Sequence, residues 1–184
     1  MHSICSMYWE DCGADSALRS VRCKLRVIEF KKGGFLRMRD SETIFRKLGF
    51  MSRCVKYLRS VDPENVNPKF DYEKRSAIER NFQLAVESAI YLGEIIISEE
   101  GFERPQDYES VFLVLGRHSI LPEAFAERFA SAAGFRNVLV HVYEEVDLRV
   151  LEEFLTERLG DFEEFAGYVL EYIEKKETKV ENEL

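Results

Sequence analysis

Three residues in the stretch RNVLVHVYEEVD, residues 136–147, have side chains that can take part in chemistry: Arg136, His141 and Tyr143. A histidine titrates near neutral pH and can accept or donate a proton, and an arginine can stabilise charge on a phosphate through its planar guanidinium. No carboxylate cluster with metal-ligand spacing accompanies them. This set is suited to metal-independent cleavage of RNA, in which the substrate supplies its own nucleophile, the 2′-hydroxyl.

The spacing of these residues limits how they can cooperate. On a helix that turns about 100° per residue, Arg136 and Tyr143 share a face, whereas His141 lies roughly 140° around from Arg136. Two routes remain open: Arg136 lies in an irregular first turn after Gly134 and reaches back, or a second copy of the helix brings its own pair alongside. As residue types alone, an arginine, a histidine and a tyrosine on one helix also have the commoner structural interpretation of a cap, a satisfied histidine and an interface tyrosine.

The chain from Asp40 onward has the apolar spacing of three and four residues that predicts helices. The expected helices cover the stripe Ile44 to Leu58, then Asp71–Ile97 as the longest, Ser110–Leu115, Pro122–Ala133, a helix beginning at Arg136, and Leu148 to about Lys176. Gly134 is expected to end the fourth of these. No β-branched alternation and no glycine-rich phosphate loop occurs, so the fold class is all-α, an antiparallel helical bundle.

Composition and charge limit the organisation and the partners. With 184 residues, 46% of them hydrophobic, the chain can bury one substantial core. The net charge of −8 is uneven: residues 1–39 carry eight Lys or Arg against four Asp or Glu, and residues 40–184 carry eighteen against thirty. Nucleic-acid binding by bulk positive charge is therefore excluded, and any contact with RNA must be local.

The cysteines and the amino terminus give no sign of a metal site or of export. Cys5, Cys12, Cys23 and Cys54 form no C-x-x-C pair, and of the histidines only His2 lies near them, so we expect free thiols, no metal and no cofactor. The first residues lack a secretory signal, and no apolar run approaches the roughly 18 residues of a membrane span. The expectation is a cytoplasmic protein without a membrane partner.

The domain organisation expected from these patterns has three parts. Residues 40–176 form the helical domain, and residues 177–184 form a polar tail. Residues 1–39 lack a sustained period and are open to two interpretations. They form a disordered extension, or they precede the true start at Met38, because Lys-Lys-Gly-Gly can be encoded by a purine-rich ribosome-binding sequence.

The motif at residues 136–143 also carries a resemblance to a known family. Arg136, four residues, His141, one residue and Tyr143 match the R-x4-H-x-Y motif of the HEPN superfamily, and the surrounding GFRNVLVHVYEEVD resembles its HepT type. The likeness extends through the preceding helices and covers about residues 40–175.

This resemblance implies a fold, an activity and partners. HepT-like proteins are helical, dimeric ribonuclease toxins that pair with a minimal nucleotidyltransferase antitoxin. Arg136 and His141 would be the catalytic pair of a composite site at the homodimer interface, with Asn137 as a polar support. Tyr143 would be the residue to which the antitoxin transfers AMP, within a homodimer or a higher hetero-oligomer. RNA would enter a narrow cleft lined by Arg136 and by surface arginines, for which Arg75, Arg80 and Arg117 are candidates.

One alternative of a different class stays open. The chain can be a non-catalytic HEPN dimer that acts as a scaffold or an RNA-binding partner of a nucleotidyltransferase. The presence of both Arg136 and His141 favours the enzyme, because a scaffold would not need them.

Overall fold

The structure is a computed structural model that describes residues 41–61, 72–141 and 148–182. The elements in chain order are the helices α2 (Ser41–Arg59), α3 (Tyr72–Glu100), α4 (Tyr108–Arg117), α5 (Glu123–His141) and α6 (Leu148–Glu153), the π-helix η3 (Phe154–Arg158), and α7 (Leu159–Asn182). No strand occurs within these three ranges, and the predicted all-α class is confirmed. Residues 1–39, with both interpretations given to them, fall outside the described residues.

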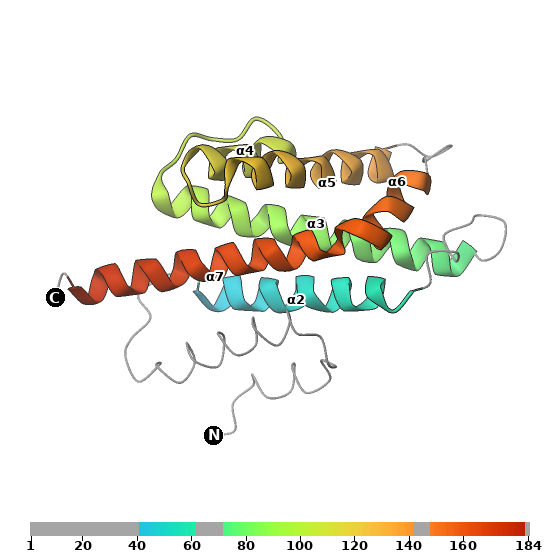
Figure 1. Cartoon of the computed structure of the whole chain (residues 1–184), viewed down its shortest axis with the longest axis horizontal. Helices are drawn as coiled ribbons and strands as arrows, with labels where there is room; N and C mark the ends of the chain where they lie inside the picture. Colours follow the sequence, from blue (N-terminus) through green and yellow to red (C-terminus); the bar gives the residue numbers. More distant parts are fainter. Residues whose placement is uncertain (1–40, 62–71, 142–147, 183–184) are drawn as a thin grey trace, which may run out of the picture.

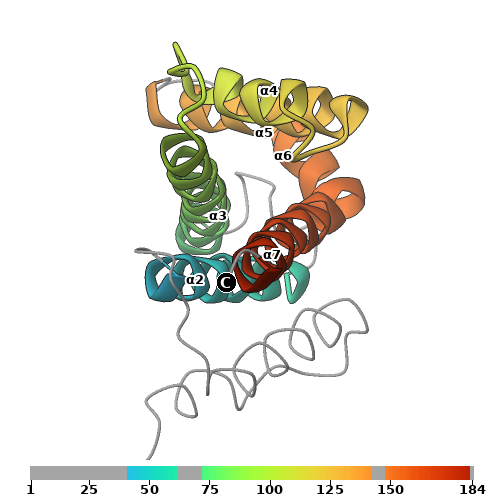
Figure 2. The ribbon, with the colours of Figure 1, turned by 90° about the vertical axis from the view of Figure 1, so that its left-hand side faces the viewer.

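The helices form an antiparallel bundle. The helices α3 and α7 run side by side through the molecule, with α2 against them on one side and α4 and α5 on the other (Figures 1 and 2). Following the chain in Figure 1, α2 and α5 run in one direction and α3 and α7 in the other. No helix in the described ranges combines the length and apolar character needed to cross a membrane.

The predicted apolar stripes form the core. Every member of the three stripes is buried: Ile44, Leu48, Met51, Val55 and Leu58 on α2; Ile78, Phe82, Ala85, Ala89, Leu92 and Ile96 on α3; and Leu151, Phe154, Leu155, Leu159, Phe162, Phe165, Val169 and Ile173 in the last helices. Phe82 lies at the centre, with its ring 5.5 Å from Phe135, 4.9 Å from Phe154 and 6.1 Å from Phe162. Aromatic packing therefore joins α3, α5, η3 and α7.

The helix α4 is held by its cap and by a close approach to α3. The side chain of Asp107 accepts a hydrogen bond from the Ser110 backbone N–H at 2.7 Å, which begins the helix at Tyr108, two residues before the prediction. At Gly93 on α3, a Cβ atom would lie 2.5 Å from Cγ1 of Val111. The absence of a side chain at Gly93 therefore lets α4 sit directly on α3.

The prediction that Gly134 ends a helix is wrong. The helix α5 runs without a break from Glu123 to His141, through Gly134 and Arg136. A glycine inside a helix costs about 1 kcal/mol relative to alanine, which is less than burial of its neighbours contributes. Ala133 and Phe135 are both buried, and a Cβ atom at Gly134 would lie 2.9 Å from Oε1 of Glu109 on α4. Tertiary packing therefore overrides the local breaking signal.

The carboxyl-terminal helices extend further than the sequence pattern predicted. Helix was expected from Leu148 to about Lys176, and the structure continues it to Asn182. Between α6 and α7 the backbone widens into η3, where Phe154 and Leu155 are both buried. Local π-helical turns within α-helices are often found near functional sites.

Candidate functional site

The Arg136 side chain is held between α5 and α3. It is 14% exposed, and its Nη2 donates to Oε1 of Glu87 at 2.6 Å, an ion pair between residues 49 positions apart. Its Nη1 donates to Oδ1 of Asn137 at 3.2 Å. The guanidinium is therefore oriented by one carboxylate and one amide oxygen.

An aromatic ring from α4 completes the surroundings of Arg136. Cζ of Arg136 lies 5.2 Å from the ring centroid of Tyr108, which is 42% exposed. A cation over a ring at this distance is stabilised by the negative face of the ring. Because the Asp107 cap fixes the first turn of α4, it also fixes Tyr108. Three helices thus converge on one guanidinium.

The Arg136 side chain keeps an unused donor. Its Nε is buried and has no hydrogen-bond acceptor among the described residues. Buried donors without a partner are uncommon in folded proteins, since each costs free energy. A guanidinium that is oriented but not fully hydrogen-bonded can take a further anionic oxygen after a small shift. This is the property required of an arginine that binds phosphate.

The helix α5 also fixes the relation between Arg136 and His141. Both residues belong to one continuous helix, of which His141 is the last residue. The first predicted route, in which Arg136 occupies an irregular turn after Gly134, is therefore wrong. The backbone positions are about 7.5 Å apart along the axis and roughly 140° apart around it. The side chain of His141, and Tyr143 altogether, lie outside the described residues.

The structure describes the positions of some residues predicted for the site and not of others. Arg136 and Asn137 lie together, in the arrangement that a supporting role for Asn137 requires. The catalytic roles of Arg136 and His141 and the modification of Tyr143 stay predictions. Within residues 41–61, 72–141 and 148–182, no three His, Cys, Asp or Glu residues gather in a way that could hold a metal ion.

The other arginines considered for the cleft are engaged with neighbours. Arg75 pairs with Glu79 on its own helix at 2.6 Å, and Arg80 donates to Gln83 at 2.9 Å. Arg117 donates to Glu103, as described below, and is 55% exposed. None of these contacts joins Arg136, so their assignment to an RNA cleft stays a prediction.

A second histidine, His118, belongs to a separate cluster at the end of α4. Its ring stacks on Phe102 at 3.7 Å, and its Nε2 lies 2.7 Å from Oε2 of Glu103. Arg117 donates to the other oxygen of Glu103 at 2.7 Å. Hydrogen bonds from His118 and then from Arg117 lower the pKa of Glu103 to about 2. These contacts hold the loop after α3 against the end of α4, and none of them involves Arg136.

Sequence reasoning missed Glu87 and Tyr108. Glu87 follows the buried Ala85 and Val86 on α3, and nothing local distinguishes it from the other glutamates of that helix. Tyr108 stands directly after the helix cap, where a surface side chain is usual. The register of α5 against α3 would have been needed to find Glu87, and its register against α4 to find Tyr108.

The sequence is similar to those of known ribonucleases. A family model described as "Ribonuclease HepT-like" matches residues 48–169, inside the range expected from the resemblance. An mRNA nuclease HepT of Shewanella oneidensis is 24% identical over 129 residues, which are 70% of this chain and 97% of that protein. A tRNA nuclease HepT of Aphanizomenon flos-aquae is 32% identical over 102 residues, 55% of this chain and 69% of that protein.

A solved structure shows the same fold. It contains a tri-AMPylated HEPN toxin of Shewanella oneidensis in complex with MNT antitoxin. It superposes with a TM-score of 0.63 at 24% identity, over 68% of this chain and 95% of that one.

Proposed function

This chain belongs to the ribonuclease HepT-like family, and from that premise we propose that it is a metal-independent endoribonuclease toxin whose catalytic residues are Arg136 and His141. The family match over residues 48–169 carries the proposal. The surroundings of Arg136 support it, because they orient a guanidinium and leave its Nε without an acceptor among the described residues.

The reaction uses the 2′-hydroxyl of RNA as nucleophile. His141 accepts the proton of that hydroxyl as its oxygen attacks the adjacent phosphorus. Arg136 stabilises the added negative charge on the phosphoryl oxygens through charge-assisted hydrogen bonds. The bond to the 5′-oxygen of the next nucleotide then breaks, and that oxygen takes a proton. The products are a 2′,3′-cyclic phosphate and a free 5′-hydroxyl, with no metal or cofactor required.

The active unit is a homodimer. The backbone positions of Arg136 and His141 lie roughly 140° apart around a single continuous helix, so one α5 is not expected to present both residues to the same phosphate. Two copies related by a two-fold axis bring Arg136 of one α5 close to His141 of the other. The composite site is therefore complete only in the dimer.

The partner that restrains this activity is a minimal nucleotidyltransferase antitoxin. The structurally similar Shewanella toxin is AMPylated and bound to an MNT antitoxin, and this chain has Tyr143 two residues after His141. AMP on the Tyr143 hydroxyl adds bulk and negative charge beside the catalytic pair. RNA phosphate is then excluded by contact and by repulsion. Both proteins act in the cytoplasm, in a homodimer or in a larger assembly with the antitoxin.

The test is cleavage of RNA by the purified chain in EDTA, with Tyr143 shown to be unmodified by intact mass. We expect the wild type to release 2′,3′-cyclic phosphate ends, and His141→Ala or Arg136→Ala to lower the rate by at least about 100-fold. Mixing the two inactive variants should restore part of the activity, because some mixed dimers keep one intact composite site. An unmodified wild type that cleaves no RNA would instead favour the scaffold alternative.

A further inference from the structure

The helix α2 differs in charge from every other described helix. It carries five Lys or Arg against a single acidic residue, Glu42. Each remaining helix, from α3 to α7, has at least as many acidic as basic residues. On a chain with a net charge of −8, α2 is therefore a local positive surface.

Arginine and aromatic residues alternate along the outward side of α2. Arg46, Phe50, Arg53 and Tyr57 follow one another at steps of four, three and four residues, which places them on one face. We name these four residues the α2 outer face. Arg46, Arg53 and Tyr57 are exposed and Phe50 is half-buried, whereas the opposite side of the helix is the core stripe.

The groups of this face are arranged for stacking as well as for charge. The guanidinium of Arg53 lies over the Phe50 ring, with Cζ 5.5 Å from the centroid. At the border with α3, Nζ of Lys47 lies 4.5 Å from the ring centroid of Tyr91, which is 40% exposed. Flat rings and guanidinium planes at a surface accept unstacked bases, and the cations beside them accept phosphates.

From these observations we infer that the α2 outer face binds a single-stranded segment of the RNA substrate. The inference rests on the proposed ribonuclease function. A polyanion such as RNA complements the excess of Lys and Arg on α2. The more acidic helices around α2 repel phosphates and so favour α2 over the other described helices as the place where RNA binds.

The α2 outer face lies away from Arg136, where cleavage is proposed to occur. In Figure 2, α2 lies on one side of the α3 and α7 pair, and α5, which carries Arg136, lies on the other. A short substrate at Arg136 therefore does not reach the α2 outer face of the same chain. An RNA long enough to pass around the bundle contacts both. The α2 outer face thus selects for long or folded RNA and contributes to binding without entering the reaction.

The test measures RNA binding and cleavage with the full chain. Binding of a fluorescent single-stranded RNA is followed by anisotropy in the His141→Ala background, over a series of salt concentrations. Arg46→Glu with Arg53→Glu is compared with Arg104→Glu with Lys175→Glu, which makes the same change in net charge at exposed positions outside α2. Tyr57→Ala is compared with Tyr72→Ala, a tyrosine 81% exposed at the start of α3. Circular dichroism confirms that each variant is folded.

The α2 charge reversal should weaken RNA binding by about tenfold or more and reduce the salt slope by about 1.4, the value for two phosphates of a single strand. Tyr57→Ala should weaken binding by about fivefold or more, as loss of one stacked base does. In the His141-intact protein, the charge reversal should raise KM for a long RNA and leave cleavage of a dinucleotide unchanged.

Two results would overturn the inference. One is equal loss of binding in the α2 variant and in the charge-matched control. The other is unchanged RNA binding together with a changed dimer mass or a lost antitoxin complex, which would make α2 a protein interface. Because binding is measured in an inactive background, it is independent of whether the wild type cleaves RNA. A wild type without activity would count against the proposed function, and the binding comparison would still decide for or against the α2 outer face.

Discussion

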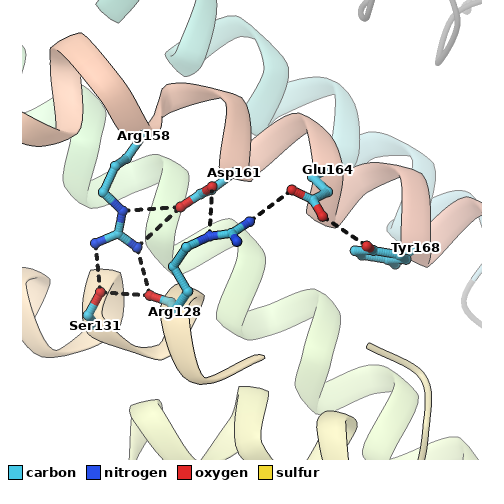
Figure 3. Close-up of polar contacts among 6 residues, drawn as sticks. All are labelled: Arg128, Ser131, Arg158, Asp161, Glu164 and Tyr168. Carbon is cyan, nitrogen blue, oxygen red and sulfur yellow. Dashed lines mark hydrogen bonds and ion pairs between the residues drawn. The ribbon is translucent and has the colours of Figure 1, made fainter. Parts of the chain in front are cut away.

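Two arginines of similar exposure, Arg136 and Arg158, have opposite hydrogen-bonding states. Arg158, 16% exposed, uses all three nitrogens: Nη1 donates to Oγ of Ser131, Nη2 to the carbonyl of Arg128, and Nε and Nη2 to Oδ2 of Asp161 (Figure 3). Arg136, 14% exposed, has one carboxylate, one amide and a buried Nε without an acceptor among the described residues. Two arginines buried to nearly the same extent therefore differ in how many of their donors are used.

Arg158 belongs to a network of ion pairs and hydrogen bonds that joins α5 to η3 and α7. Nε of Arg128 on α5 pairs with Asp161 at 3.2 Å, and its Nη2 donates to Glu164 at 2.9 Å. Tyr168 donates to the other oxygen of Glu164 at 2.8 Å, so the contacts continue along α7 (Figure 3). The network fixes α5 against α7 with charges that are already compensated. Arg136 and its neighbours lie on the other side of α5, where this helix meets α3 and α4.

The largest effect expected from this comparison is the loss of stability in Arg158→Ala. The change removes four hydrogen bonds, one to Ser131 Oγ, one to the Arg128 carbonyl and two to Asp161 Oδ2, at a cost of about 2 kcal/mol, so Tm should fall by roughly 4–8 °C. The kcat of the variant should stay within about twofold of wild type. Thermal unfolding and RNA cleavage, both compared with Arg136→Ala, measure the two effects. A variant of Arg158 that loses activity but not stability would contradict the comparison.

A smaller effect is expected at Glu87, the carboxylate that orients Arg136. Glu87→Ala removes the 2.6 Å contact and should lower kcat by about tenfold, because the guanidinium no longer keeps one orientation. Glu87→Gln keeps an oxygen that accepts from Nη2 and should recover most of that loss. Steady-state cleavage separates kcat from KM for both variants. Equal activity of wild type and Glu87→Ala would show that Arg136 needs no such orientation.

The smallest effect is expected at an arginine exposed to solvent, Arg117, which together with His118 binds Glu103. The pKa of Glu103 is about 2, below its ordinary value of 4.5. The ionised carboxylate therefore contributes its full stabilisation above pH 4.5, and this stabilisation is lost as the pH falls through about 2. Because the Glu103 side chain is exposed to solvent, the change in Tm should be slight. Titration of Glu103 by NMR should give the low midpoint in wild type and a higher one in Arg117→Ala. A midpoint near 4.5 in wild type would mean that these contacts do not persist in solution.

The parts of the fold that are local in sequence were predictable. Apolar spacing identified the buried faces of α2, α3 and α7. The continuation of α5 through Gly134 was not predictable, because a glycine is a local breaking signal and the packing that overrides it, around the buried Ala133 and Phe135, involves other helices. Glu87 was missed for the same physical reason. Its importance depends on the register between α3 and α5, which no single helix contains.

The close approach of α4 to α3 has a consequence for how this sequence can vary. A Cβ atom at position 93 would lie 2.5 Å from Cγ1 of Val111, and valine has too little rotamer freedom on a helix to move aside. A larger residue at 93 is therefore compatible with this fold only beside a smaller one at 111. A lone substitution there would displace α4 and, with it, the Tyr108 ring from Arg136. Substitutions at positions 93 and 111 can therefore change the surroundings of Arg136, although neither residue contacts it.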